Sequence, residues 1–248
     1  MIELKNANQL DRMRNAGRIV AETLALMREL AKPGVTTLEL DRMAEDYIRA
    51  QGAIPAFKGY NGFPATLCTS VNEQVVHGIP SLRCLESGDI ISIDCGAVID
   101  GYFGDAAVTL PIGEVSEDLQ KLLRVTEESL MLGIAQAKIG NRLYDVSYAV
   151  QAHVEANGFS VVRDYVGHGI GRAMHEEPQI PNFGKPGRGP RLELGMVLAI
   201  EPMVNMGTYE VQTLKDHWTV VTKDSRPSAH FEHTVAITEN GLEILTRC

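Results

Sequence analysis

The spacing of apolar residues along the chain predicts amphipathic helices in its first quarter. Between residues 8 and 31, apolar side chains recur at steps of three, four or seven residues, the period of one helical face, and a Pro-Gly pair ends the run. Thr36 followed by Glu39 forms a capping box, because each side chain can satisfy a free amide at the start of a helix. A second helix is therefore expected over about residues 37–51.

Two more apolar stripes of helical period occupy the middle of the chain. One follows Ser116, and the other follows Gly140 and ends at Asn157-Gly158. The simplest interpretation of such a stripe is that it faces the core of the domain. We therefore expect all four helices to pack against one hydrophobic core.

Short segments rich in Val, Ile and Thr, separated by turn residues, predict β-strands. Several follow one another without a helix between them, so the sheet is expected to be largely antiparallel, with the helices on one face. The predicted fold class is α+β. A dense run of Pro and Gly at residues 176–195 is expected to be a rigid loop. The predicted strands are residues 65–71, 89–99, 102–110, 159–166, 196–201, 211–222 and 229–238.

Composition limits the class of protein. With 248 residues, 44% of them hydrophobic, the chain can bury a sizeable core, and we predict one domain over residues 1–248 and a monomer. A net charge of −9 argues against nucleic acid as a substrate. No signal peptide and no run of about 18 apolar residues is visible, so neither export nor a membrane is expected. The cysteines show no metal or disulfide spacing, which fits a reducing cytoplasm; they are Cys68, Cys84, Cys95 and Cys248.

Two aspartates in the sequence DIISIDCGAVIDGYFGDAAVTL are the first candidates for chemistry. Asp is depleted in strands, yet Asp94 and Asp105 lie in strand-like runs on either side of a turn near residue 100. In an antiparallel hairpin, the residue numbers of each paired couple have a constant sum, which defines the register. Asp94 and Asp105 are directly opposed if this sum is 199 and diagonal neighbours if it is 201, so they are close in either register. Two facing carboxylates need a shared proton or a cation. From this hairpin alone, a metal ligand and a solvent-facing aspartate are equally good interpretations.

Two histidines follow in the glycine-rich sequence YVGHGIGRAMHEEP. Glycine lets backbone approach a ligand closely, and the neutral imidazoles of His168 and His175 could ligate a metal or transfer a proton. Taken alone, this sequence favours structural histidines. The pattern GHGIGR does not fit a dinucleotide-binding loop, because Arg172 occupies the final glycine position.

Two glutamates lie in apolar, strand-forming sequences. Glu201 in MVLAIEPM and Glu232 in AHFEHTVAI would incur a large desolvation cost if unpaired. Few basic residues occupy comparable settings, so a shared cation accounts for both more simply than salt bridges. With His168 and the two aspartates, they make a hard, oxygen-rich ligand set that can bridge two ions about 3.5–4 Å apart.

These segments resemble the bacterial-type methionine aminopeptidases, members of the pita-bread metallopeptidase family. The resemblance covers nearly the whole chain in the family's order, and it implies a curved, largely antiparallel sheet covered by helices on its outer face. The matching segments are FKGYNGFPATLCTSVNEQVVHGIP, DIISIDCGAVIDGYFGDAAVTL, VGHGIGRAMHEEPQIPNF, GMVLAIEPMVN and LKDHWTVVTKDSRPSAHFEHTVAI.

The resemblance implies a role for each candidate ligand. Asp94 would chelate one metal, and Asp105 and Glu232 would bridge both. His168 and Glu201 would complete the second site. The implied cofactors are two divalent ions, and the sequence does not distinguish Mn, Fe, Co and Zn.

The resemblance also implies contacts with a substrate. His77 and His175 would hydrogen-bond the substrate backbone and the developing oxyanion, and Glu201 would transfer a proton from water to the leaving amine. Met174 is a departure, because family members often carry an aromatic residue there, and it affects the shape of the pocket. Without the resemblance, the single tryptophan would indicate core packing. The implied methionine pocket is lined by Tyr60, Phe63, Cys68 and Trp218.

The implied activity is removal of the N-terminal methionine from nascent proteins, with a small second residue preferred. Two alternatives are a proline-directed relative, aminopeptidase P or prolidase, and a metal-free binding module with the same fold. A basic loop is compatible with transient contact with the ribosome or with a solvated surface; it contains Lys215, Lys223 and Arg226.

Overall fold

The four predicted helices are present in the computed structural model, which describes residues 2–247. Where the sequence predicted a helix boundary, the structure agrees with it within about two residues, the usual uncertainty of helix boundaries. The Thr36–Glu39 capping box is confirmed, because Glu39 Oε2 accepts from the Thr36 amide at 2.8 Å and Thr36 Oγ1 accepts from the Glu39 amide at 3.2 Å. The helices are α1 (Ala7–Leu30), α2 (Thr37–Ala50), α3 (Glu117–Ile134) and α4 (Leu143–Ala156).

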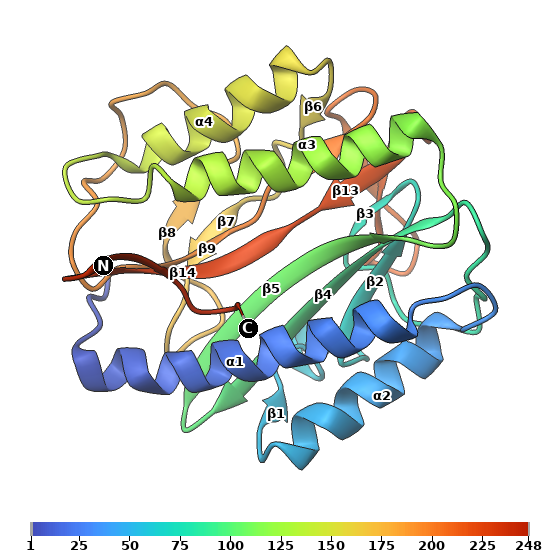
Figure 1. Cartoon of the computed structure of the whole chain (residues 1–248), viewed down its shortest axis with the longest axis horizontal. Helices are drawn as coiled ribbons and strands as arrows, with labels where there is room; N and C mark the ends of the chain where they lie inside the picture. The colour runs from blue at the N-terminus through green and yellow to red at the C-terminus, as the bar shows by residue number, and fades with distance from the viewer. Residues whose placement is uncertain (1, 248) are drawn as a thin grey trace.

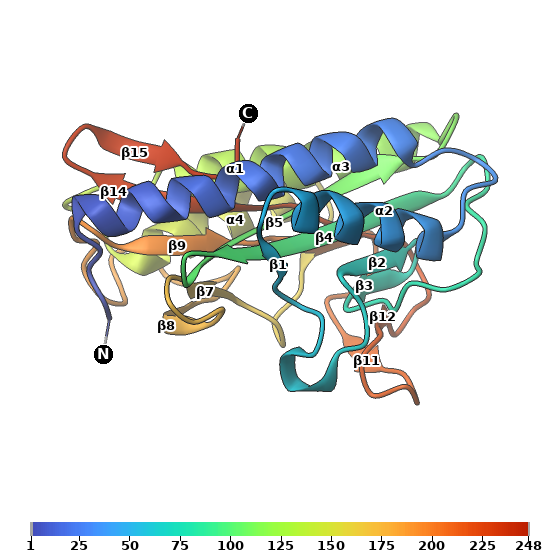
Figure 2. The same ribbon diagram turned by 90° about the horizontal axis from the view of Figure 1, so that it is seen from below.

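The strands form one large sheet and two small ones, and every strand pairing among residues 2–247 is antiparallel, as predicted. The large sheet has the order β1-β4-β5-β14-β9-β7-β8, with β2 on β4 and β15 on β14 (Figure 1; β15 is labelled in Figure 2). Its strands are β1 (Ile54–Pro55), β2 (Leu67–Val71), β4 (Ile90–Ile99), β5 (Tyr102–Pro111), β7 (Gly167–Gly169), β8 (Glu176–Ile180), β9 (Val197–Ile200), β14 (Glu232–Thr238) and β15 (Gly241–Ile244).

The two small sheets have the orders β13-β10-β6 and β11-β12-β3. A short 3₁₀ helix, η1, spans Tyr60–Gly62. The strands of the small sheets are β3 (Gln74–Val76), β6 (Ser160–Val161), β10 (Met203–Asn205), β11 (Val211–Thr213), β12 (Val220–Thr222) and β13 (Ser228–His230).

Four of the predicted segments were wrong in detail. Residues 176–195 contain β8, an edge strand, where Pro178 is tolerated because an edge strand needs fewer ladder donors. Residues 211–222 are two strands joined by a turn, and residues 229–238 are broken where the Phe231 amide donates to the Pro202 carbonyl at 3.3 Å. Of residues 159–166, only the two residues of β6 are extended in a ladder.

The helices cover one face of the large sheet, and the end of the sheet formed by β7 and β8 curls away from them, toward the side where β11 and β12 also lie (Figure 2). The main core lies between helices and sheet, where Val20, Met27 and Leu40 pack with Ile91 and Ile93. The β-carbon direction alternates along a strand, so Cys95 and Ala106 point into this core and the residues next to them point to the opposite face. That opposite face is where the candidate site forms.

None of the helices within residues 2–247 is long and apolar enough to cross a membrane. Cys68 and Cys95 are buried, Cys84 is exposed, and all three are free thiols. Cys248 lies outside the described residues.

Helix α1 approaches β5 so closely that the contact leaves no room for a side chain. A β-carbon on Gly104 would lie 2.8 Å from the Gly17 amide nitrogen and 2.9 Å from the Ala16 carbonyl carbon. We expect Gly104→Ala to lower the free energy of unfolding by about 1–3 kcal/mol, because helix and strand must separate. Urea denaturation with an unchanged m-value measures this.

A matched control is Gly184→Ala, whose new β-carbon would meet only the movable Tyr144 side chain at 3.3 Å. We expect it to change stability by no more than about 0.5 kcal/mol. Equal effects of the two substitutions would contradict the importance of the close approach of α1 to β5.

Candidate metal centre

The β4–β5 hairpin fixes the relation of the two aspartates. Its two turn residues, Asp100 and Gly101, have φ of 51° and 75°, as a tight type I′ turn requires. The paired positions sum to 201, the diagonal register, so Asp94 opposes Ala107 and Asp105 opposes Gly96. Asp105 lies two residues before Ala107, hence both aspartates project from the same face.

Strand pairing places the remaining candidates on that face. Glu232 opposes Ala107 from the other side, which puts its side chain next to the aspartates. Thr234, two residues further along β14, opposes Ala199 of β9. His168 of β7 also opposes Ala199, and Glu201 follows Ala199 by two residues. The five candidate ligands therefore come from neighbouring strands in the order β4, β5, β14, β9 and β7, with Glu201 just beyond β9.

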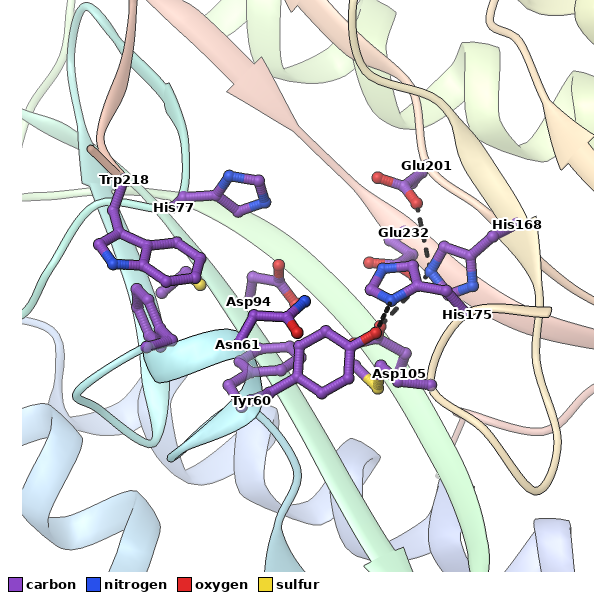
Figure 3. Close-up of a pocket in the computed structure, with 14 residues that line it drawn as sticks. Tyr60, Asn61, His77, Asp94, Asp105, His168, His175, Glu201, Trp218 and Glu232 are labelled. Carbon is purple, nitrogen blue, oxygen red and sulfur yellow. Dashed lines mark hydrogen bonds and ion pairs between the residues drawn. The ribbon is translucent and has the colours of Figure 1, made fainter. Parts of the chain in front are cut away.

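The five side chains converge at short distances (Figure 3). His168 Nε2 lies 3.6 Å from Glu201 Oε1 and 3.8 Å from Asp105 Oδ2. Asp105, His168 and Glu232 offer ligand atoms that all lie within 4.8 Å of one another. Ligand atoms this close together allow one cation to contact all three residues.

The donor atoms of this cluster fit a divalent cation. Asp94 Oδ1, Asp105 Oδ1 and Glu232 Oε1 are buried without a hydrogen-bond partner. No Lys or Arg among residues 2–247 forms an ion pair with any of the four carboxylates. Buried charge of one sign without partners is costly, and hard oxygen donors with one imidazole suit a divalent metal.

The electrostatics of the metal-free protein reflect the same crowding. Burial raises the pKa of Asp94 to about 7, against hydrogen bonds from Asp105 and the Cys95 amide that lower it. Burial, followed by neighbouring carboxylates, raises the pKa of Asp105, Glu201 and Glu232 well above the usual range. Without a cation, the cluster therefore retains protons that exposed carboxyl groups lose near pH 4.

The histidines at the site are neutral near pH 7. Burial lowers the pKa of His168 and of His77 to about 4, and it lowers the pKa of His175. His168 Nδ1 donates to the Gly169 carbonyl at 2.9 Å, so Nε2 carries a lone pair and faces the carboxylates. His77 holds a left-handed backbone conformation with φ of 61°, a strained state that is most common at functional sites.

A cavity of about 200 Å³ opens beside the cluster, and all eleven residues predicted for the site line it. Its apolar end contains Phe63 and Trp218, whose rings meet edge to face at 5.1 Å, and Met174, which is buried. Burial raises the pKa of the Cys68 thiol, so this cysteine is a wall of the cavity and not an activated nucleophile. The sequence did not indicate Phe57 or Asn61. The lining residues are Phe57, Tyr60, Asn61, Phe63, Cys68, His77, Asp94, Asp105, His168, Met174, His175, Glu201, Trp218 and Glu232.

The loop that carries His175 is held by an ion pair with the N-terminal segment of the chain. Lys5 Nζ donates to Glu176 Oε2 in a buried ion pair, with 2% of the Lys5 side chain exposed. The other oxygen of Glu176 accepts from the amides of Arg172 and Ala173 at 2.8 and 3.2 Å. His175 itself is fixed by Tyr60, whose hydroxyl lies 2.9 Å from Nδ1 (Figure 3).

One residue of the centre was missed by the sequence analysis. His230 is 1% exposed, and its Nε2 lies 3.8 Å from Glu201 Oε2 and 3.9 Å from Glu232 Oε2. It forms a second possible ligand group with these two glutamates. The spacing could have revealed it, because residues two apart in an extended segment share a face and His230 precedes Glu232 by two.

Comparison with known proteins agrees with this geometry. The model of metallopeptidase family M24 matches residues 11–239. The chain is 60% identical to the methionine aminopeptidase of Clostridium acetobutylicum over 100% of both chains. It superposes on the crystal structure of the methionine aminopeptidase of Thermotoga maritima with a TM-score of 0.98 at 48% identity, covering 100% of each chain.

A more distant likeness concerns the fold alone. The Xaa-Pro dipeptidase of Bacillus anthracis matches with a TM-score of 0.80 at 22% identity, and the match covers 99% of this chain but 62% of that enzyme. Both kinds of protein therefore share the curled sheet with its helical cover, which confirms the predicted pita-bread architecture.

The raised carboxyl pKa values predict how the metal-free protein responds to pH. The unfolded carboxyls titrate near 4, so between about pH 4 and pH 7 the folded state binds more protons than the unfolded state. The contribution of the cluster to stability is therefore lost as pH rises through this window. We expect Asp105→Asn to stabilise the metal-free protein at pH 7 by about 1–3 kcal/mol and to have little effect at pH 4.

Urea denaturation in the presence of a chelator at several pH values measures the difference. Asp100→Asn is the matched control, because Asp100 is exposed in the hairpin turn and Asn also tolerates positive φ. A metal-free Asp105→Asn protein that is less stable than wild type at pH 7 would show that the carboxylate has a structural role.

Proposed function

The chain belongs to metallopeptidase family M24 and, within it, to the methionine aminopeptidases, hydrolases that remove an N-terminal methionine; from this premise we propose which of its residues bind metal and substrate. The observation that carries the proposal is the convergence of five ligand side chains from neighbouring strands on one cavity with an apolar end. The proposed metal ligands are Asp94, Asp105, His168, Glu201 and Glu232.

The ligand set suits two divalent cations, of which Mn, Fe, Co and Zn are the candidates. When bound, such ions lower the pKa of water and polarise a carbonyl group, as in other hydrolases with paired metals. By the family resemblance, Asp105 and Glu232 would contribute to holding both ions and Asp94 to holding the first. His168 and Glu201 would complete the second site.

The side chains around the ligands supply proton transfer and hydrogen bonds. Burial raises the pKa of Glu201, so its ionised carboxylate is a stronger base than an exposed one, and we assign it the transfer of a proton from water to the leaving amine. His77 and His175 are neutral at pH 7, and each therefore has one N–H to donate to the substrate carbonyl as negative charge develops there. The Tyr60 hydroxyl can donate to His175 Nδ1, which leaves the Nε2–H of His175 free.

The apolar end of the cavity suits the methionine side chain. Phe63 and Trp218 offer ring edges and faces to a thioether, a favourable contact for sulfur. Cys68 and Met174 complete the wall with soft, polarizable atoms. With Met174 at this position, the wall is flexible, because an unbranched side chain has three rotatable bonds.

Several expectations from the sequence stay predictions. These are one catalytic domain over residues 1–248, a monomer, a cytoplasmic location and contact with the ribosome. The three basic residues lie on two loops rather than one, Lys215 between β11 and β12 and Lys223 and Arg226 between β12 and β13. Lys223 pairs with Glu210 at 3.1 Å, which satisfies part of its charge within the protein.

A peptide panel tests the function. With Mn²⁺, we expect release of methionine from Met-Ala-Ser, little from Met-Leu-Ser because of its larger second residue, and none of the first residue from Leu-Ala-Ser or Ala-Pro-Ser. The measurement is the free amino acid released per minute. Cleavage of Ala-Pro-Ser in preference to Met-Ala-Ser would favour the proline-directed alternative, and no cleavage of any peptide would favour a binding module.

The metal assignment is tested with the same peptide. We expect Glu232→Gln to lose about three orders of magnitude in the rate of methionine release, because weaker metal binding forfeits several kcal/mol of transition-state stabilisation. Asp100→Asn should release methionine at the wild-type rate. Retained activity in Glu232→Gln would defeat the assignment of paired metals.

The role of His175 calls for a separate measurement. We expect His175→Ala to lower kcat by about 100- to 1000-fold, the cost of one lost hydrogen bond to the developing oxyanion. The metal content of the variant, measured by elemental analysis, should equal that of wild type. A variant that lost its metal instead would show that His175 supports the ligands and does not contact the substrate.

A further inference from the structure

His230 is fixed in place at the end of β13. Its amide donates to Thr109 Oγ1 at 2.8 Å, and its carbonyl accepts from the same hydroxyl at 2.7 Å. It also pairs with Met203 of β10. The backbone is thus held from two sides, and the imidazole has little freedom to leave the centre.

The imidazole points at two of the proposed metal ligands and at no better partner. Nε2 is buried, unpartnered, and nearly equidistant from Glu201 Oε2 and Glu232 Oε2. The distances of 3.8 and 3.9 Å exceed a hydrogen bond by about 0.9 Å, which a small rotation of either carboxylate can close. Glu201 therefore lies between two imidazoles, with Oε1 toward His168 and Oε2 toward His230.

His168 and His230 differ in the hydrogen-bond partner of Nδ1. The carbonyl of Gly169 holds the proton of His168 on Nδ1, so Nε2 is free to ligate a cation. His230 Nδ1 forms no hydrogen bond with any of residues 2–247, so no carbonyl draws the proton to that nitrogen. The groups that face His230 are carboxylate oxygens, which are acceptors when ionised, so the tautomer with the proton on Nε2 is favoured.

We propose that His230 is a positioning residue of the metal centre, whose Nε2–H donates to the Glu201 and Glu232 carboxylates and orients their free oxygens toward the cations. The inference rests on the proposed function, because it takes both glutamates as metal ligands. Removing a side chain that hydrogen-bonds a metal ligand without contacting the metal itself typically changes metal affinity by 10- to 100-fold.

Co²⁺ binding to variants of His230 distinguishes the loss of its hydrogen-bond donor from the loss of its side-chain volume. Calorimetric titration of metal-stripped protein with Co²⁺ is expected to show about 10- to 100-fold weaker binding in His230→Leu, which lacks a donor. His230→Gln places an amide N–H near the position of Nε2, so its affinity should stay within about threefold of wild type. The matched control is His233→Gln, because His233 is on the other face of β14 and bonds Thr246 Oγ1 at 2.9 Å; its affinity should equal that of wild type.

A second measurement does not depend on the stability of the leucine variant. In zinc-loaded protein with ¹⁵N-labelled histidine, the nitrogen shifts report which ring atom carries the proton. We expect His230 to be protonated at Nε2 and His168 at Nδ1, with the His230 signals identified by their loss in His230→Gln.

Three outcomes would overturn the proposal. They are wild-type Co²⁺ affinity in His230→Leu, equally weak binding in His230→Gln and His230→Leu, and a bare Nε2 on His230 in the spectrum. Failure of the proposed function has a different signature, because wild-type protein would then bind no Co²⁺ or Glu232→Gln would bind it as tightly as wild type.

Discussion

Four carboxylates around one cavity, those of Asp105 and Glu232 buried and those of Asp94 and Glu201 partly buried, repel one another, and the rest of the fold holds them together against that repulsion. No positively charged side chain within residues 2–247 pairs with them, and three of their oxygens are without partners. The backbone ladders of five adjacent strands fix the positions of these groups. In the metal-free protein, gathering the metal ligands therefore lowers the stability of the fold. Once cations neutralise the cluster, the same arrangement of ligands favours both stability and metal binding.

The helices matter to the site indirectly, through the other face of the sheet. Alternation along β4 sends Asp94 to the cavity and Cys95 into the core under α1, and the same holds for Asp105 and Ala106 on β5. A slip of one residue in either strand would bury a carboxylate under the helices and expose a core residue. Apolar packing between the helices and one face of the sheet thus selects the strand register that brings the ligands together on the opposite face.

Much of this could be predicted from the sequence because the signals are local. Helical stripes, capping residues and acidic residues inside strand-like runs each reveal themselves within a few positions, as Thr36 and Asp94 do. Strand β8 was missed because its Pro and Gly content suggests a loop, and only its place at the sheet edge makes Pro178 acceptable. His230 was missed although it precedes Glu232 by only two residues, because its contacts with Glu201 and Thr109 join it to residues far away in the sequence.

The buried pair of Lys5 and Glu176 joins the first residues of the chain to the loop beside the site. During synthesis, Lys5 leaves the ribosome long before its partner exists, so its ammonium group must stay hydrated until 171 more residues have been added. The ion pair that helps to order the loop at His175 can therefore form only after all four helices and the strands up to β7 have been made. A nascent chain interrupted before residue 176 lacks the Glu176 carboxylate and leaves Lys5 with its neighbour Glu3, whose carbonyl and carboxylate lie 3.2 and 3.6 Å from Nζ.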